Sequence, residues 1–282
     1  MSIIRPLARQ GVSDPLLAKK KCRENKKGCG TQYWYDYFVD PSIAGPEEDT
    51  TPEVLTDPTI WLSASEPGFV YADNDPITSG WNDISGFARH FTTNYGAGTY
   101  PLYRSNLSHP YVDFDDANKK VGRGTVPFTD FMGLTVGTIA MIINQYHATQ
   151  PNAVATHRPA DATNKWLQHL AFSDNNFYID WGNQASGGRA SFAMPSGWRN
   201  GSFKVLIIRR NGNRLDVYQD GVSVYGNASA YSSGRTNTSD NIDLGGVSGF
   251  GWRLAEWITW NRSITDQEVI DLDTYLQTIK PA

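Results

Sequence analysis

The chain has 282 residues, a formal net charge of −4 and only two cysteines, which is typical of a globular protein with one large domain and an appendage. No segment approaches the roughly 18 consecutive apolar residues that a membrane span needs, so no membrane-spanning segment is expected. The 26 glycines, 15 prolines and numerous aromatic residues, with few long helical patterns, favour a sheet-rich sandwich or barrel.

The N-terminal segment is basic, whereas the rest of the chain is acidic. Residues 1–30 carry eight lysines and arginines against Asp14 and Glu24. The stretch DPSIAGPEEDTTPEVLTDP (40–58) has the composition of an extended linker. We therefore predict an extended N-terminal arm and linker over 1–55 and a folded body over 56–282. The arm is interpreted as a partner-binding segment, with a solvated tail as the alternative; its predicted contact residues are Arg5, Arg9, Lys19, Lys20 and Lys21.

The N-terminus also lacks the apolar core of a secretory signal, so we expect the chain to stay in the cytosol in which it is made. Cys22 and Cys29 are then predicted to be free thiols, with a disulfide as the alternative. No metal site is predicted, because zinc would need two further ligands and no histidine lies near the cysteine pair. Nucleic-acid binding is not expected, since no other basic stretch supports the arm.

Candidate strands recur along the body with turns between them. They cover 59–64, 111–115, 134–146, 176–181, 202–210, 214–226 and 241–246. Asn211-Gly212 and Asp220-Gly221 lie between consecutive strands and can supply the positive φ angles of tight hairpin turns. The strand over 202–210 is nearly all apolar at its centre, which predicts a central position covered on both sides.

The closing segment predicts an aromatic strand followed by a capped helix. Trp252, Leu254, Ile258 and Trp260 would share one face of the strand at period two. Thr265 can cap the helix, with Glu268 three residues later completing a capping box. Apolar residues then follow at helical spacing: Val269, Leu272, Tyr275, Leu276 and Ile279.

The order of these pieces resembles a known superfamily. IWLSAS, WNDISG, YVDFDD, VYQDGVSV, IDLGG and RLAEWITWNRSITDQEVIDLDTYL together are similar to the laminin G-like, concanavalin A-like jelly rolls common in bacterial and phage proteins. The resemblance spans 56–280 and implies an all-β fold, a jelly-roll sandwich of two antiparallel sheets with a short C-terminal helix. The N-terminal IRPLAR is also similar to the start of tailed-phage structural proteins that carry such domains.

This superfamily includes glycan binders, glycosidases and plain structural modules, so the site residues must decide. Retaining glycosidases of the laminarinase type resemble one another in a Glu-x-Asp-x-Glu strand, which this sequence lacks. Asp113 and Asp115 come closest to such a pattern, as two carboxylates on one face of a strand. The favoured interpretation of this pair is a strand end that enters a polar turn. GxSxG is absent and the histidines lie in no familiar motif. No catalytic residue is predicted.

The resemblance implies calcium as the most frequent cofactor, and two clusters carry suitable oxygen atoms. Asp73, Asn74 and Asp75 form one cluster, and Asp113–Asp116 contains the other. Neither has the spacing of a defined calcium loop, and six to eight oxygens must converge on the ion. We predict no cofactor, with calcium as the alternative.

Sugar recognition combines an aromatic face with nearby polar groups. Among nine tryptophans, Trp61, Trp252 and Trp260 fit core strands, whereas three others border Gly/Asn-rich loops. The candidate glycan site therefore consists of Trp166, Trp181, Asn183, Trp198 and Arg199. The alternative role for the three tryptophan side chains is to cover the hydrophobic core.

The sequence as a whole favours a non-enzymatic structural protein of a phage virion, of capsid-decoration, head or tail-fibre type. Its lectin-like jelly roll would be anchored by the arm to other virion proteins, would assemble as a homo-oligomer, and could display a site for cell-surface glycans. The alternatives are a glycan-binding module of a bacterial surface or secreted protein and, less favoured, a polysaccharide-degrading enzyme.

Overall fold

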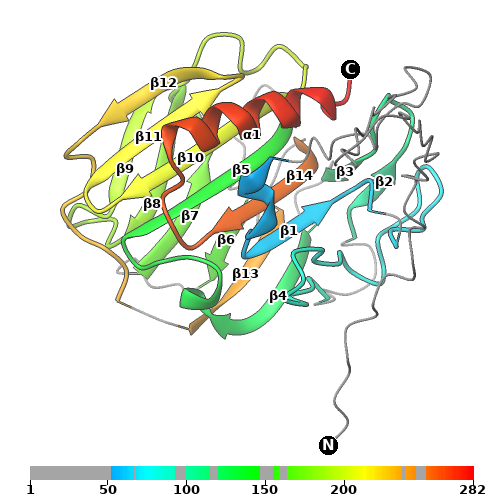
Figure 1. The fold of residues 1–282 in the computed structure, drawn as a ribbon, viewed down its shortest axis with the longest axis horizontal. Helices are drawn as coiled ribbons and strands as arrows, with labels where there is room; N and C mark the ends of the chain where they lie inside the picture. Colours follow the sequence, from blue (N-terminus) through cyan, green and yellow to red (C-terminus); the bar gives the residue numbers. More distant parts are fainter. Residues whose placement is uncertain are drawn as a thin grey trace, which may run out of the picture. The chain divides into compact units, whose positions relative to one another are not determined.

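The computed structural model describes residues 52–66, 68–92, 100–114, 120–146, 155–158, 164–236, 239–245 and 252–282. All of these belong to one compact unit, Thr51–Ala282. The described residues of this unit form two antiparallel sheets and a single C-terminal α-helix (Figure 1), which confirms the predicted all-β sandwich. The arm and both cysteines lie outside the described residues.

The larger sheet has eight strands in the order β12-β11-β10-β5-β14-β3-β2, and β1 also pairs with β14. Its strands are β1 (Ile60–Ser63), β2 (Leu102–Arg104), β3 (Tyr111–Phe114), β5 (Val136–Gln145), β10 (Lys204–Asn211), β11 (Arg214–Gln219), β12 (Val222–Asn227) and β14 (Trp252–Trp260). The strands β1 and β3 pair with different halves of β14, with Ser63 opposite Glu256 and Asp113 opposite Arg253.

The smaller sheet has six strands in the order β4-β13-β6-β7-β8-β9. Its strands are β4 (Lys120–Pro127), β6 (Ala155–Arg158), β7 (Lys165–His169), β8 (Asn176–Gly182), β9 (Arg189–Ala193) and β13 (Ser239–Gly245). A short 3-10 helix, η2 (Phe128–Asp130), follows β4.

The main hydrophobic core lies between the two sheets. Alternating residues of β10 show how the faces divide: Leu206 and Ile208 belong to this core, whereas Val205 and Ile207 belong to a second cluster. Because β10 pairs with both β5 and β11 and is buried on both faces, the predicted central strand is confirmed.

Tight turns join the hairpins on either side of β11. In the turn between β11 and β12, Asp220 has φ 47° and Gly221 has φ 75°, as a type I′ turn requires. In the preceding turn only Gly212 has a positive φ, 60°, which fits a type II′ turn that starts one residue later than the sequence predicted.

The second cluster lies on the outer face of the eight-stranded sheet, under α1 (Asp266–Thr278) and the 3-10 helix η1 (Glu53–Thr56). Helix α1 crosses this face (Figure 1) and contacts β10 and η1. Val54 and Leu55 are buried in the cluster. The predicted domain boundary between 55 and 56 therefore falls inside η1, and the last residues of the predicted linker belong to the body.

A β-bulge in β14 changes the predicted faces of the closing strand. The pairing with β5 shifts between Leu254 and Glu256, which leaves Ala255 as the extra residue. Trp252 and Leu254 consequently face the main core, whereas Ile258 and Trp260 face the second cluster. The prediction that these four residues share one face was wrong, because a bulge reverses the alternation beyond it.

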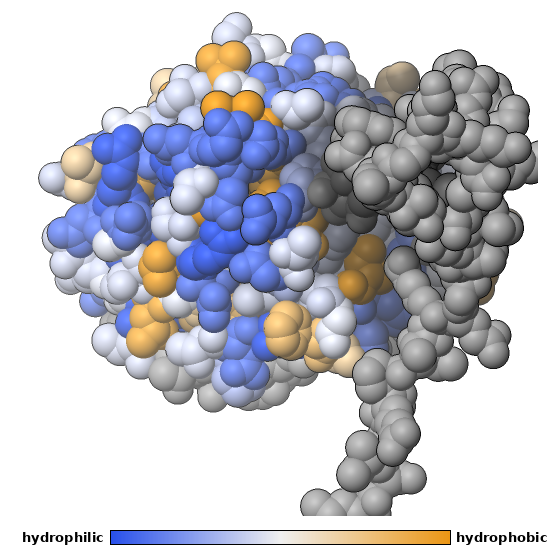
Figure 2. Space-filling view, viewed as in Figure 1, coloured by the Kyte–Doolittle hydropathy of each residue, from blue (hydrophilic) through white to orange (hydrophobic). Residues whose placement is uncertain are grey.

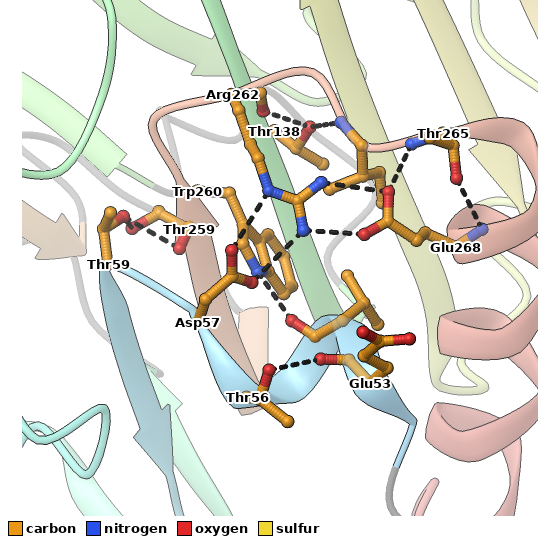
Figure 3. Close-up of polar contacts among 12 residues, drawn as sticks. Glu53, Thr56, Asp57, Thr59, Thr138, Thr259, Trp260, Arg262, Thr265 and Glu268 are labelled. Carbon is orange, nitrogen blue, oxygen red and sulfur yellow. Dashed lines mark hydrogen bonds and ion pairs between the residues drawn. The ribbon is translucent and has the colours of Figure 1, made fainter.

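The step from β14 into α1 is held by a network of polar contacts (Figure 3). Arg262 donates to both oxygens of Glu268, at 2.9 and 2.6 Å, and to Asp57 after η1. Glu268 also accepts from the backbone N–H of Thr265, and the Thr265 hydroxyl accepts from the backbone N–H of Glu268, so the predicted capping box is confirmed. The indole Nε1 of Trp260 donates to the Val54 carbonyl at 2.9 Å.

The described surface over α1 and its neighbouring strands is mainly hydrophilic, with isolated hydrophobic residues (Figure 2). Ile270 on α1 is one such residue, at 58% exposure. No helix in the described part of the chain is long and apolar enough to cross a membrane.

Candidate binding site on the outer face of the larger sheet

Strands β2, β3 and β14 bring charged and aromatic residues together on the outer face of the eight-stranded sheet. Arg253 is opposite Asp113, and Arg104 is opposite Tyr111. The residues next to them in sequence, including Val112 and Leu254, belong to the main core on the inner face. Alternation along each strand therefore directs the charged residues outward.

A buried carboxylate lies at the centre of this group. The Asp113 side chain is 4% exposed and its Oδ2 lies 3.3 Å from Arg253 Nε and 3.7 Å from Arg104 Nε. The Tyr146 hydroxyl, just after β5, donates to Oδ1 of Asp113 at 3.1 Å. A desolvated carboxylate needs such partners, because an unpaired buried charge is strongly destabilising.

Aromatic rings hold Arg253 in place. Its guanidinium carbon lies 4.3 Å from the ring centroid of Tyr146 and 5.3 Å from that of Tyr111. The Tyr111 hydroxyl donates to Asn106 Oδ1 at 3.1 Å. Burial raises the pKa of Tyr111, Arg253 opposes this rise and Asp113 adds to it, so the phenol stays protonated at neutral pH. We call Arg104 and Arg253 the arginine pair.

A second buried carboxylate lies further along β14. Glu256 is fully buried; its Oε2 accepts from Trp61 Nε1 at 2.8 Å and its Oε1 accepts from the Ser63 hydroxyl at 2.6 Å. His109 Nε2 lies 3.5 Å from Oε1. In the sequence, Glu256 was visible only as an interruption of an apolar alternation, so this group was missed.

The outer face of the smaller sheet carries a different charged group. Asp180 on β8 is fully buried and accepts from Arg189 Nε at 2.5 Å and Nη2 at 2.7 Å. Burial lowers the pKa of His169 on β7 to about 4, although Asp180 acts in the opposite direction. This bidentate pair uses the guanidinium fork of Arg189 within the protein, which favours a structural role.

The tryptophans of the predicted glycan site lie in the core. Trp166 on β7 and Trp181 on β8 are fully buried with ring centroids 6.4 Å apart, and Trp198 is 1% exposed. Trp198 packs against Phe177 and donates from Nε1 to Gln145 at 2.6 Å. A buried ring offers no face to a sugar, so the structure gives these three residues the alternative role, packing in the core.

The two polar residues of that predicted site form hydrogen bonds within the loops that surround them. Asn183 Oδ1 accepts from the Ala185 N–H at 3.0 Å. Arg199 donates to the carbonyl of Ala171 at 2.7 Å and to Asn175 Oδ1 at 3.2 Å. Both residues are partly exposed, and a role for them in glycan binding stays a prediction.

The predicted calcium cluster at 73–75 forms a turn. Asp75 Oδ2 accepts from the Ala72 N–H, and Asp73 accepts from the Ser105 N–H and the Asn74 amide. No group of three His, Cys, Asp or Glu side chains that could hold a metal ion occurs among the described residues. Asp115, Asp116 and the arm residues from Arg5 to Lys21 lie outside them, so calcium binding and the role of the arm stay predictions.

No protein-family model matches the sequence, and no curated protein sequence matches it. The fold, in contrast, is similar to solved binding domains. The receptor-binding domain of botulinum neurotoxin type G is 12% identical at a TM-score of 0.54, over 78% of this chain and 51% of that chain. The binding domain of Paraclostridial Mosquitocidal Protein 1 is 13% identical at a TM-score of 0.55, over 79% of this chain and 53% of that chain.

A third similar structure is the ligand-binding domain of botulinum neurotoxin serotype D in complex with N-acetylneuraminic acid. It is 8% identical at a TM-score of 0.50, over 78% of this chain and 51% of that chain. Our chain thus spans about half the length of these domains. Identities this low establish the fold alone, and the chain adopts a β-sandwich of jelly-roll type that is also found in binding domains of toxins.

Proposed function

We propose that this protein is a non-catalytic carbohydrate-binding module and that it binds glycans around the arginine pair. The observation that carries the proposal is the convergence of two partly exposed arginines, a buried aspartate and two tyrosines on one sheet face. Sugars expose hydroxyl groups around an apolar ring, so their sites combine fixed polar groups with aromatic side chains.

The fold and the sequence resemblance agree with this proposal. The laminin G-like superfamily includes glycan binders, and the similar solved structures are binding domains, one of them crystallised with N-acetylneuraminic acid. Fold similarity alone does not decide function, so the weight rests on the residues of the site.

Several contacts argue against catalysis at this face. A general acid or base must reach the substrate with its own oxygen atoms. The carboxylate of Asp113 contacts two guanidiniums and the hydroxyl of Tyr146, and that of Glu256 accepts from Trp61 and Ser63. Both acids are buried, which fits residues that position their neighbours.

We further propose that the module belongs to a phage virion and is anchored there by its basic arm. The charge of residues 1–30 and the resemblance of IRPLAR to tailed-phage structural proteins support it. Capsid and tail genes on either side of this gene are the expected observation. A neighbourhood of secreted-toxin or surface-protein genes would instead favour a bacterial glycan-binding module.

The glycan proposal is tested by binding of the purified full-length chain to a glycan array. On this array, each acidic glycan is paired with its neutral parent. We expect selective binding of a subset, with no hydrolysis of the bound glycans or of β-glucan, alginate and peptidoglycan fragments. Absence of binding to any glycan would refute the proposed function. Turnover that is lost in Asp113→Asn would show an enzyme instead.

A further inference from the structure

We propose that the arginine pair, Arg104 and Arg253, binds the anionic group of an acidic sugar, a carboxylate or a sulfate. This inference rests on the proposed function, since it names the chemical class of glycan that the same site takes.

The described contacts of both arginines with acceptors are made through Nε. Arg253 Nε lies 3.3 Å and Arg104 Nε lies 3.7 Å from the same oxygen, Oδ2 of Asp113. Every other arginine whose side chain the structure describes uses at least one terminal Nη nitrogen in a contact with an oxygen atom. These are Arg89, Arg189, Arg199, Arg209, Arg210, Arg214, Arg235 and Arg262.

This difference matters because the terminal nitrogens form the fork that binds planar oxyanions. A guanidinium and a carboxylate can form two parallel hydrogen bonds, a geometry that also suits sulfate and phosphate. Arg189 shows the filled arrangement within this protein, since its Nε and Nη2 both contact Asp180. In the arginine pair, no described contact of this kind occupies the Nη ends.

The charges of the cluster also favour an anion. Two guanidiniums share one carboxylate, so the group of Arg104, Arg253 and Asp113 carries a formal excess of one positive charge in a protein of net charge −4. The neighbouring acid Asp73 accepts from the Ser105 N–H and the Asn74 amide, and forms no described ion pair with either arginine.

The site is also preorganised and accessible. The Arg104 side chain is 22% exposed and that of Arg253 is 29% exposed, so solvent reaches both. Arg253 is fixed by the ring of Tyr146 and by the buried Asp113, and a fixed donor loses little entropy when it binds a ligand. Tyr111 and Asn106 lie beside it and supply the aromatic and amide groups that distinguish a sugar site from a bare anion site.

The first experiment compares matched ligands on the full-length chain by isothermal titration calorimetry. Sialyllactose carries a carboxylate, sulfolactose carries a sulfate, and lactose is their neutral parent; any acidic hit from the array is added with its own parent. We expect at least one acidic ligand to bind about tenfold or more tightly than its parent, as one charge-assisted contact allows. Its affinity should fall with added salt.

The second experiment uses variants with a matched control. Arg104→Gln should weaken the acidic ligand about tenfold and should weaken its neutral parent by a clearly smaller factor, because only the acidic ligand loses a charge-assisted contact. Arg104 contacts Asp113 only at 3.7 Å, so this variant should fold. Arg253→Lys keeps the charge but loses the fork, and should weaken acidic binding in the same direction. The control is Arg214→Gln, because Arg214 pairs with Asp216 on β11, four strands from β3 in the same sheet.

The outcomes separate the two proposals. Equal binding of acidic and neutral glycans, or acidic selectivity that survives both arginine variants, would overturn the inference while the carbohydrate-binding function stands. Binding to no glycan at all would overturn both. Inorganic phosphate is included as a competitor. If phosphate displaced the acidic glycan at equal concentration, the arginine pair would be a general anion site, and the inference that it recognises an acidic sugar would be refuted.

Discussion

Replacing Trp260 by alanine tests the second hydrophobic cluster, which joins β14, α1 and η1. The Trp260 side chain is fully buried and its Nε1 donates to the Val54 carbonyl at 2.9 Å. Truncation of a buried tryptophan costs about 3–5 kcal/mol, and the lost hydrogen bond adds about 1 kcal/mol. For a domain of this size, the melting temperature should fall by about 10–20 °C.

Thermal unfolding of the full-length chain, followed by circular dichroism, measures this effect. Trp260→Phe should produce a smaller fall, because much of the buried ring remains while the donor to Val54 is lost. Ile270→Ala is the control: that side chain is 58% exposed on α1 and its loss should cost less than about 0.5 kcal/mol. If Trp260→Ala melted within about 2 °C of the parent, the assignment of Trp260 to the core would be wrong.

Three further predictions concern the closing helix and the smaller sheet. Thr265→Ala should cost about 0.5–2 kcal/mol in chemical unfolding, because it removes the hydroxyl of the capping box; an unchanged midpoint would contradict this role. The Arg262 guanidinium lowers the pKa of Glu268 from 4.5 to about 2, so the folded state binds fewer protons than the unfolded state between these values. This stabilisation is present above pH 4.5 and lost as the pH falls toward 2, and Glu268→Gln should show a shallower loss of stability across that range in acid-unfolding curves. Burial lowers the pKa of His169 from 6.5 to about 4, so its contribution to stability is present above pH 6.5 and decreases as the pH falls toward 4. An NMR titration should show its imidazole still neutral at about pH 5.5, and a midpoint near 6.5 would refute its burial.

The features that the sequence predicted well depend on residues close together in the chain. The capping box joins Thr265 to Glu268, and the turn at Asp220-Gly221 needs two adjacent residues that tolerate positive φ. The main strands followed from apolar runs, as in β10. The strands that were missed, β2, β4, β6, β7 and β9, are short or carry glycine and polar residues, so their pattern is weak without the neighbouring strand that completes their hydrogen bonds.

The faces and the site depended on contacts between distant parts of the chain. The extra residue at Ala255 reversed the alternation in β14, and a bulge leaves no clear mark in a sequence of large apolar residues. The burial of Trp166 and Trp181 depends on packing between the two sheets, which a loop-like local composition concealed. The arginine pair is the strongest case: Arg104 and Arg253 are far apart in sequence, and strand pairing on either side of β3 brings them to one oxygen of Asp113. Local composition and spacing thus indicated a sheet-rich fold and its closing helix, and the resemblance narrowed that fold to a jelly-roll sandwich. The register of the sheet decided which residues could form a site, because only pairing between distant strands determines which side chains meet.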